Sequence, residues 1–144
     1  MRHYVAQHRA ELREHHRDAL QRLVAHFTQF GRPAFERVLI DRSQADTRRR
    51  LVAELPNLVR AVRALRNPRE AAALCRLAVA LLSAVGKVDD AVELAEQVLR
   101  LPLDERTHAR LLIALIRPMP VLANPERVER LVADAVRLYV MIVV

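Results

Sequence analysis

Residues 67–85 read NPREAAALCRLAVALLSAV, and this stretch decides the fold class. Asn67 can cap a helix, Pro68 suits its first turn, and Glu70 stands where its side chain can reach back to the cap. After these signals only Arg76 and Ser83 are polar before the next glycine, so the helix is apolar nearly all round. The stretch therefore predicts the central, buried helix of a bundle.

The flanking segments also repeat at about 3.6 residues, and none alternates with the period of two that half-buried strands show. We predict an all-α fold, with an N-terminal helical arm followed by a four-helix bundle. The arm is assigned to residues 1–50 and the bundle, which would make subunit contacts, to residues 51–144. The further helices are expected at 4–30, 34–41, 51–65 with a break at Pro56, 88–101, about 104–117 and from Pro125 onward, with 42–50 as a polar connection.

The net charge of +7 lies entirely in the first half of the chain. Residues 1–66 carry 14 Arg against 7 Asp and Glu, whereas residues 67–144 carry 10 basic and 10 acidic side chains. All basic residues except Lys87 are arginines, whose planar guanidinium groups bind phosphate oxygens in pairs. Such a composition suits hot growth or a GC-rich genome. The asymmetry predicts a polyanionic partner, which could be nucleic acid, an acidic membrane or an acidic protein.

The basic residues of the first half form two sets. On a helical wheel, one arc of the first helix is cationic and the opposite arc, with Glu11, Glu14 and Asp18, is anionic. The cationic arc contains Arg2, Arg9, Arg13, His16 and Arg17, and the second set contains Arg48, Arg49, Arg50, Arg60 and Arg63. We expect all ten to neutralise phosphates of double-stranded DNA. The alternative for the first helix is a solvated surface whose charges segregate without a function.

The scarcity of aromatic residues and of base-reading side chains indicates which kind of nucleic acid the chain would bind. Three Phe, two Tyr and no Trp, none interleaved with the basic sets, disfavour the base stacking typical of single-strand binders. A second helix with polar base-reading side chains, as in a helix-turn-helix, is not evident. The expected contacts are therefore independent of DNA sequence.

Catalytic patterns are missing from the sequence. The two glycines are isolated, so they form no phosphate-binding loop, and no Cys and His cluster has the spacing of metal ligands. Cys75 lies in an apolar stretch and is expected to be a small buried hydrophobe. We predict a protein that is not an enzyme and has no cofactor, metal or small-molecule substrate. With no signal-peptide pattern and no apolar run of about 18 residues, we expect it to be soluble and not exported.

Two short stretches resemble major coat proteins of rod-shaped and filamentous viruses of hyperthermophilic archaea. The first is Phe27-Thr28-Gln29-Phe30-Gly31-Arg32-Pro33 with the helix that reaches Leu39, which is similar to the Phe-Thr-x-Phe-x-x-Pro junction between arm and bundle in those proteins. The second is Ala123-Asn124-Pro125, which leads into a Val- and Leu-rich helix. The nearly exclusive use of Arg and the few aromatics depart from better-known members, so the virus group and the contact residues stay open.

The resemblance implies a structural virion protein that packages linear double-stranded DNA, held in A-form, in a helical filament. Its partners would be the DNA and a second coat subunit, either the same chain or a paralogue. It would reside in the virion, and in the host cytoplasm during assembly, with membrane contact only through an outer envelope. A neighbouring subunit would cover the apolar C-terminus, Met141-Ile142-Val143-Val144.

The alternative interpretation is an interaction scaffold. Glu54-x-x-Asn57-Leu58 and the chain that follows to Leu99 are similar to the helical-repeat region of bacterial signalling ATPases, where such a helix precedes tetratricopeptide-like hairpins. Residues 86–91, GKVDDA, resemble the turn of such a repeat. A second copy at a period of 34 residues is not evident, and repeat stacks usually need at least three units. The coat protein is therefore the preferred hypothesis.

Overall fold

The computed structural model describes residues 2–28, 45–116 and 125–143, which contain seven helices and no strand. The all-α prediction is confirmed. The predicted helix over 34–41, the turn at Gly31 to Pro33 and the break at Pro118 to Pro120 lie outside the described residues. The helices are α1 (Arg2–Thr28), α3 (Ala45–Ala53), α4 (Leu55–Ala64), α5 (Pro68–Ala84), α6 (Val88–Leu99), α7 (Glu105–Ile116) and α8 (Pro125–Val143).

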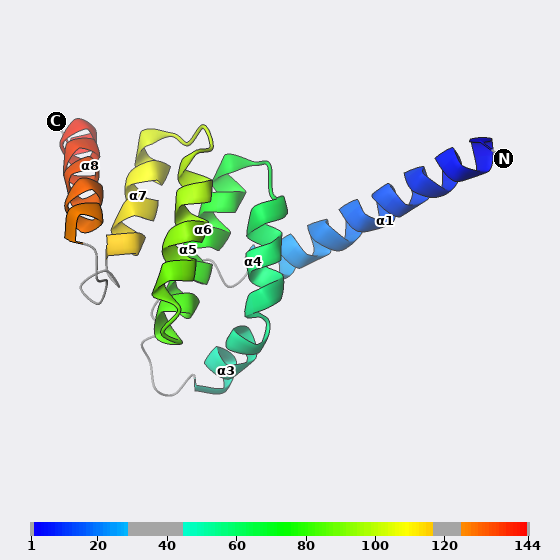
Figure 1. Cartoon of the computed structure of the whole chain (residues 1–144), viewed down its shortest axis with the longest axis horizontal. Coiled ribbons are helices and arrows are strands. Elements are labelled where there is room, and N and C mark those ends of the chain that lie inside the picture. Colours follow the sequence, from blue (N-terminus) through cyan, green and yellow to red (C-terminus); the bar gives the residue numbers. More distant parts are fainter. Residues whose placement is uncertain (1, 29–44, 117–124, 144) are drawn as a thin grey trace.

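In Figure 1, α8, α7, the overlapping pair of α5 and α6, and α4 follow one another in a row. Each of α4, α5, α6 and α7 packs against the next helix, and α4 also packs against α6, as α5 does against α7. At one end of the row α8 lies against α7. At the other end α1 touches α4 and α5 and then runs away from the body (Figure 1). The four helices predicted after Asn67 are thus α5 to α8, and α4 joins them as a fifth.

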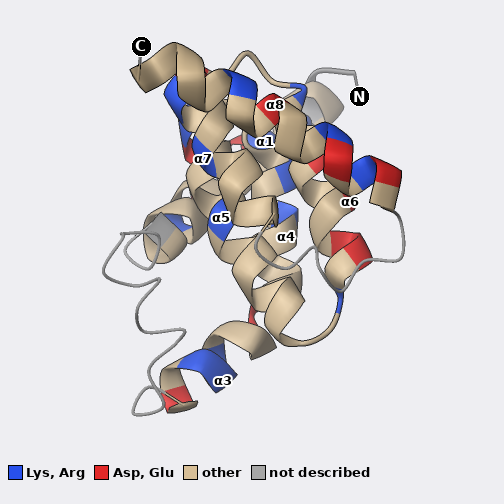
Figure 2. Cartoon of the chain, turned by 90° about the vertical axis from the view of Figure 1, so that its left-hand side faces the viewer, with Lys and Arg blue, Asp and Glu red and all other residues tan. Residues whose placement is uncertain are grey.

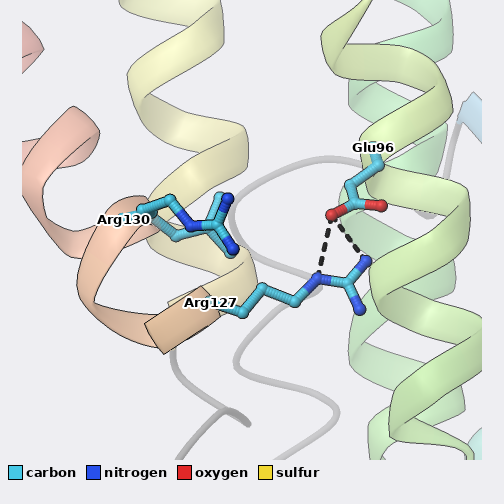
Figure 3. A pocket seen from close by; sticks show the side chains of 4 residues that line it. Glu96, Arg127 and Arg130 are labelled. Carbon is cyan, nitrogen blue, oxygen red and sulfur yellow. Dashed lines mark hydrogen bonds and ion pairs between the residues drawn. The ribbon is translucent and has the colours of Figure 1, made fainter. Parts of the chain in front are cut away.

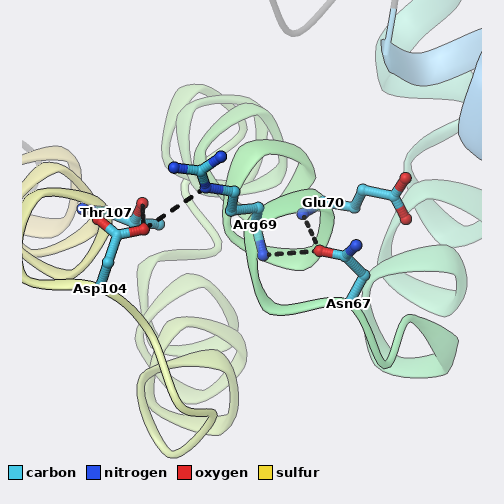
Figure 4. A network of polar contacts seen from close by, with 5 residues as sticks. All are labelled: Asn67, Arg69, Glu70, Asp104 and Thr107. Carbon is cyan, nitrogen blue, oxygen red and sulfur yellow. Dashed lines mark hydrogen bonds and ion pairs between the residues drawn. The ribbon is translucent and has the colours of Figure 1, made fainter.

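The central position belongs to α5, as the sequence predicts. The Asn67 side chain accepts hydrogen bonds from the backbone N–H groups of Arg69 and Glu70 at 3.0 and 3.3 Å, which starts the helix (Figure 4). Neighbours on several sides bury nine of its residues, from Ala71 to Leu82. Gly86 ends the segment with a φ of 79°, in the left-handed region that glycine adopts without strain.

Two details differ from the expectation for residues 42–65. The polar run is not a connection, because Ala45–Ala53 form α3, with Leu51 buried and arginines that favour helix. The break lies at Glu54 and not at Pro56, which stands in the first turn of α4, where its missing N–H costs nothing. The expected division between residues 50 and 51 falls inside α3.

The last four helices form two hairpins whose burial repeats in part. α7 begins 37 residues after α5 (105 against 68), and α8 begins 37 residues after α6 (125 against 88). Five positions that are buried in the first hairpin are buried again at this spacing in the second, whereas Glu129 and Val132, the counterparts of Val92 and Ala95, are exposed. The pairs are Ala72 and Ala109, Leu74 and Leu111, Cys75 and Leu112, Ala78 and Leu115, and Val98 and Ala135. The repeat is therefore structural, although few of its residues are identical.

The second hairpin differs from the first in what covers it. Ala95 of α6 is fully buried, whereas Val132 at the same repeat position in α8 is 38% exposed. Further along α8, Val136, Tyr139, Val140 and Met141 are each more than half exposed. This helix lies at the surface (Figure 2). α8 therefore exposes several large apolar side chains, whereas α6 buries five of its residues against its neighbours.

The packing of α7 predicts that truncating two of its residues, one buried and one exposed, lowers the free energy of unfolding by different amounts. Leu111 is fully buried and Ile113 is 48% exposed. Leu111→Ala should lower the free energy of unfolding by about 2–5 kcal/mol, because it removes apolar contacts and leaves a cavity. Ile113→Ala should change it by less than about 1 kcal/mol. Urea unfolding followed by circular dichroism measures both, and equal losses would contradict this packing.

Candidate functional site

The first candidate surface is the projecting helix α1. Residues 5–19 are all exposed, and the helix is attached to the body through its last two turns. There Phe27 is fully buried, and Leu20, Leu23 and Val24 pack against the core. His26 Nε2 lies 3.1 Å from Glu54 Oε2, which ties the end of α1 to the junction of α3 and α4. α1 is thus attached to the body at its C-terminal end, and the rest of the helix projects away from the body (Figure 1).

The predicted cationic arc lies along this helix. Arg9, Arg13, His16 and Arg17 are exposed, and Arg2 stands in the first turn. At 100° per residue, the arc continues into the stripe of Leu20, Val24 and Phe27 that packs against the body. One side of α1 is therefore basic where it projects and apolar where it is anchored.

The second predicted set lies on α3 and α4 and does not join the first. Arg49 pairs with Asp46 at 3.1 Å, Arg50 is exposed, and Arg48 is half-buried with its Nε atom shielded from solvent. α3 lies at the N-terminal end of α4, whereas α1 leaves the body in another direction (Figure 1). The predicted residues are thus divided among the projecting helix α1 and the helices α3 and α4 of the body.

Arg60 and Arg63, the remaining two, line a groove of about 670 Å³ on α4. Lys87 and Asp90 also line it, together with Val52, Leu55, Pro56, Val59, Leu82 and Val85. The groove is therefore mostly apolar, with cationic groups beside it.

A third surface was not predicted. Between α5 and α7 lies a hollow of about 350 Å³, which we call the arginine hollow. Its lining is Arg69, Ala72, Ala73 and Arg76 from α5, Asp104 before α7, and Arg106, Thr107 and Arg110 from α7. Four arginines and one aspartate thus line the same hollow, although residues 67–144 are neutral as a whole. Two sequence signals were available: Arg69 and Arg106 are 37 residues apart, and Arg106 and Arg110 share one helix face.

Asp104 is fixed at one side of the arginine hollow. Its Oδ1 accepts a hydrogen bond from the Thr107 backbone N–H at 2.9 Å, and its Oδ2 accepts one from the Thr107 hydroxyl at 2.8 Å (Figure 4). Arg69 Nε lies 3.6 Å from Oδ2. These hydrogen bonds from Thr107, together with Arg69, hold the pKa of Asp104 below its ordinary value. The carboxylate is therefore ionised at neutral pH and caps α7.

A second small hollow, between α6 and α8, has a structural explanation. It is lined by Glu96, Arg127, Arg130 and Leu131 (Figure 3). Arg127 donates from Nε to Glu96 Oε1 at 3.0 Å, and its Nη2 pairs with the same oxygen. Both side chains are partly shielded from solvent. This ion pair joins the two hairpins.

The described residues offer little for catalysis. Burial raises the pKa of the Cys75 thiol to about 12, so a thiolate nucleophile does not form there. Within the described ranges, no group of three His, Cys, Asp or Glu side chains is arranged to hold a metal ion. Likewise, none of the described helices has the length and apolar character needed to cross a membrane.

The cap of α7 gives a pH-dependent prediction. Because the folded pKa of Asp104 is depressed, its ionised form stabilises the fold above the ordinary pKa of 3.8, and this contribution is lost as the pH falls through the folded value. Asp104→Ala should lower the melting temperature near neutral pH, and the difference should shrink below about pH 4. Asp104→Asn, which keeps an acceptor for α7, should lose less. Thermal unfolding over a pH series tests this, and a constant difference for Asp104→Ala would contradict it.

Comparison with known proteins assigns no function to any of these surfaces. No protein-family model, curated protein or solved structure matches the chain. The functional inference therefore depends on the geometry of the surfaces themselves.

Proposed function

We propose that the chain is an interaction module of the helical-repeat type, which binds a partner protein and catalyses no reaction. The observation that carries this proposal is the 37-residue spacing at which both the helices and their buried positions recur. In repeat proteins each unit contacts its neighbours, and equivalent helices line up into an extended binding surface. This favours the alternative from the sequence over the coat protein.

The order of packing supports the same proposal. Each helix from α4 to α7 packs against the next one along the chain, as in a stack that grows by adding hairpins. The Glu54-x-x-Asn57-Leu58 pattern, which resembles the helix before tetratricopeptide-like hairpins, lies where α3 gives way to α4. The observed spacing is longer than the expected 34 residues.

The proposed binding surface is the side on which α5 and α7 lie together. These are the first helices of the two hairpins, and they pack against each other. Ala73 is exposed and lines the arginine hollow together with Arg76 of α5 and Arg110 of α7. A small residue at this position leaves room for the side chains or backbone of a partner.

A selection from a library of displayed random peptides tests the interaction module. We expect a family of related peptides that bind in the micromolar range and no longer bind Ala73→Trp, because the indole fills the hollow. Glu93→Trp places the same side chain at an exposed position of α6 and should keep binding. Fluorescence anisotropy gives the affinities. If no peptide family is enriched, or if both variants bind as wild type does, the proposed surface is wrong.

A second candidate, the coat protein of a DNA filament, is favoured by one observation. The exposed arc of Arg9, Arg13, His16 and Arg17 lies on a helix that projects from the body, where a duplex has room to approach it. In this hypothesis α1 and the arginines of α3 and α4 neutralise phosphates, while α8 contacts a second subunit, either the same chain or a paralogue. The assembly would be a virion filament around A-form DNA, with or without an envelope.

The two candidates predict different behaviour with random-sequence duplex DNA. If each chain neutralises about 7 phosphates, the slope of log affinity against log salt is roughly −6. Replacing Arg9, Arg13 and Arg17 by Ala should then reduce the slope by roughly 3, and electron microscopy should show regular filaments. Replacing Arg100, Arg106 and Arg110 by Ala removes the same charge from exposed positions outside the proposed DNA surface and is the control. If the slope of log affinity against log salt is near zero and no filaments form, the coat-protein hypothesis is wrong.

A further inference from the structure

We infer that the arginine hollow between α5 and α7 binds carboxylate side chains of an acidic peptide segment. This inference rests on the proposed interaction module and names the chemical class of its partner. It is carried by Arg69, Arg76, Arg106 and Arg110, which two helices bring to one hollow of about 350 Å³.

The charges around this hollow are unbalanced. Four guanidinium groups line it against the single carboxylate of Asp104, which already accepts two hydrogen bonds from Thr107. The first turn of α6 holds two of the acidic residues of this half, Asp89 and Asp90, and neither lines the hollow. In the lining itself, arginines therefore outnumber carboxylates four to one, while Glu70 and Glu105 are exposed in the first turns of α5 and α7.

The arginines differ in how firmly they are held. Arg76 is half-buried, with its Nε atom shielded from solvent, so its stem forms part of the wall. Arg69 is 84% exposed on its side chain, and its contact with Asp104 is 3.6 Å long. An exposed ion pair of this kind contributes little, so Arg69 can turn to a ligand at small cost. Arg106 and Arg110 are exposed one helical turn apart.

The shape and lining favour a peptide over a nucleic acid. Ala72 and Ala73 occupy the α5 side between the arginines, so an extended chain can approach the helix closely. A rigid duplex presents its phosphates on a convex surface, which does not enter a hollow between two helices. A single strand would need an aromatic side chain for stacking, and the lining contains none. Carboxylates fit the fork of a guanidinium group with two parallel hydrogen bonds.

Backbone amides contribute little to this site. Asn67 and Asp104 already cap the first turns of α5 and α7, because their side chains accept the N–H groups of Arg69, Glu70 and Thr107 (Figure 4). A small free anion would therefore find no cradle of backbone donors. Several carboxylates spaced along a chain match four separated guanidinium groups better than one compact anion does.

The test uses a short fluorescein-labelled peptide in which Glu and Asp alternate with Ala and Ser. We expect it to bind the full chain in the micromolar range, and the same peptide with Gln and Asn should not bind. The double variant Arg106→Glu/Arg110→Glu should weaken binding roughly tenfold or more. The matched control, Arg100→Glu/Arg137→Glu, changes the net charge equally at exposed positions outside the hollow and should stay within about twofold. Arg106→Gln/Arg110→Gln repeats the test without new charges, and circular dichroism verifies that each variant folds.

Four outcomes would overturn the inference. The first is that the acidic peptide does not bind, and the second is that both charge-reversal variants lose the same affinity for it. The third is that inorganic phosphate, added at the same total negative charge as the peptide, displaces it. The fourth is that duplex DNA binds and that this binding depends on Arg106 and Arg110. A library-selected peptide without acidic residues that binds the α5 and α7 surface would also overturn it, but would leave the interaction module intact. If neither the acidic peptide nor any library-selected peptide binds, both this inference and the interaction module are wrong.

Discussion

The burial of α5 on several sides at once is the constraint on which the rest of the structure depends. It packs against α4, α6 and α7 and touches α1, and Ala71, Ala72, Cys75 and Ala78 on it are each at most 1% exposed. Small side chains at these positions let the neighbouring helices approach closely. Because α5 holds α7 beside it, the side of this pair that is left open is where the arginine hollow forms.

The same packing explains how a chain with one basic half carries two kinds of basic surface. α1 is anchored only by its last two turns, so its arginines stand on a projecting helix. The arginines of α5 and α7 instead line a hollow within the neutral half. A projecting helix suits a broad polyanion, and a hollow suits separate anionic side chains. Net charge alone does not distinguish these two cases.

Much of the fold could be predicted from local sequence. Pro68, Val88 and Pro125 begin their helices where the sequence places them, because caps and prolines act on the nearest turn. α3 was missed because an arginine run reads as polar, yet arginine favours helix. The arginine hollow was missed although Arg69 and Arg106 are 37 residues apart, because the pairing of α5 with α7 is a property of the packing and not of either helix alone. The 37-residue repeat is likewise seen in which positions are buried, whereas its two copies share few identical residues.

Backbone amide chemical shifts of the labelled chain, recorded as the acidic peptide is added, locate the bound peptide. We expect shifts confined to the hollow, from Arg69 to Arg76 in α5 and from Arg106 to Arg110 in α7, with the arm unchanged. Shifts along α1 or along the exposed face of α8, with none in α5 and α7, would show that the peptide does not bind in the arginine hollow.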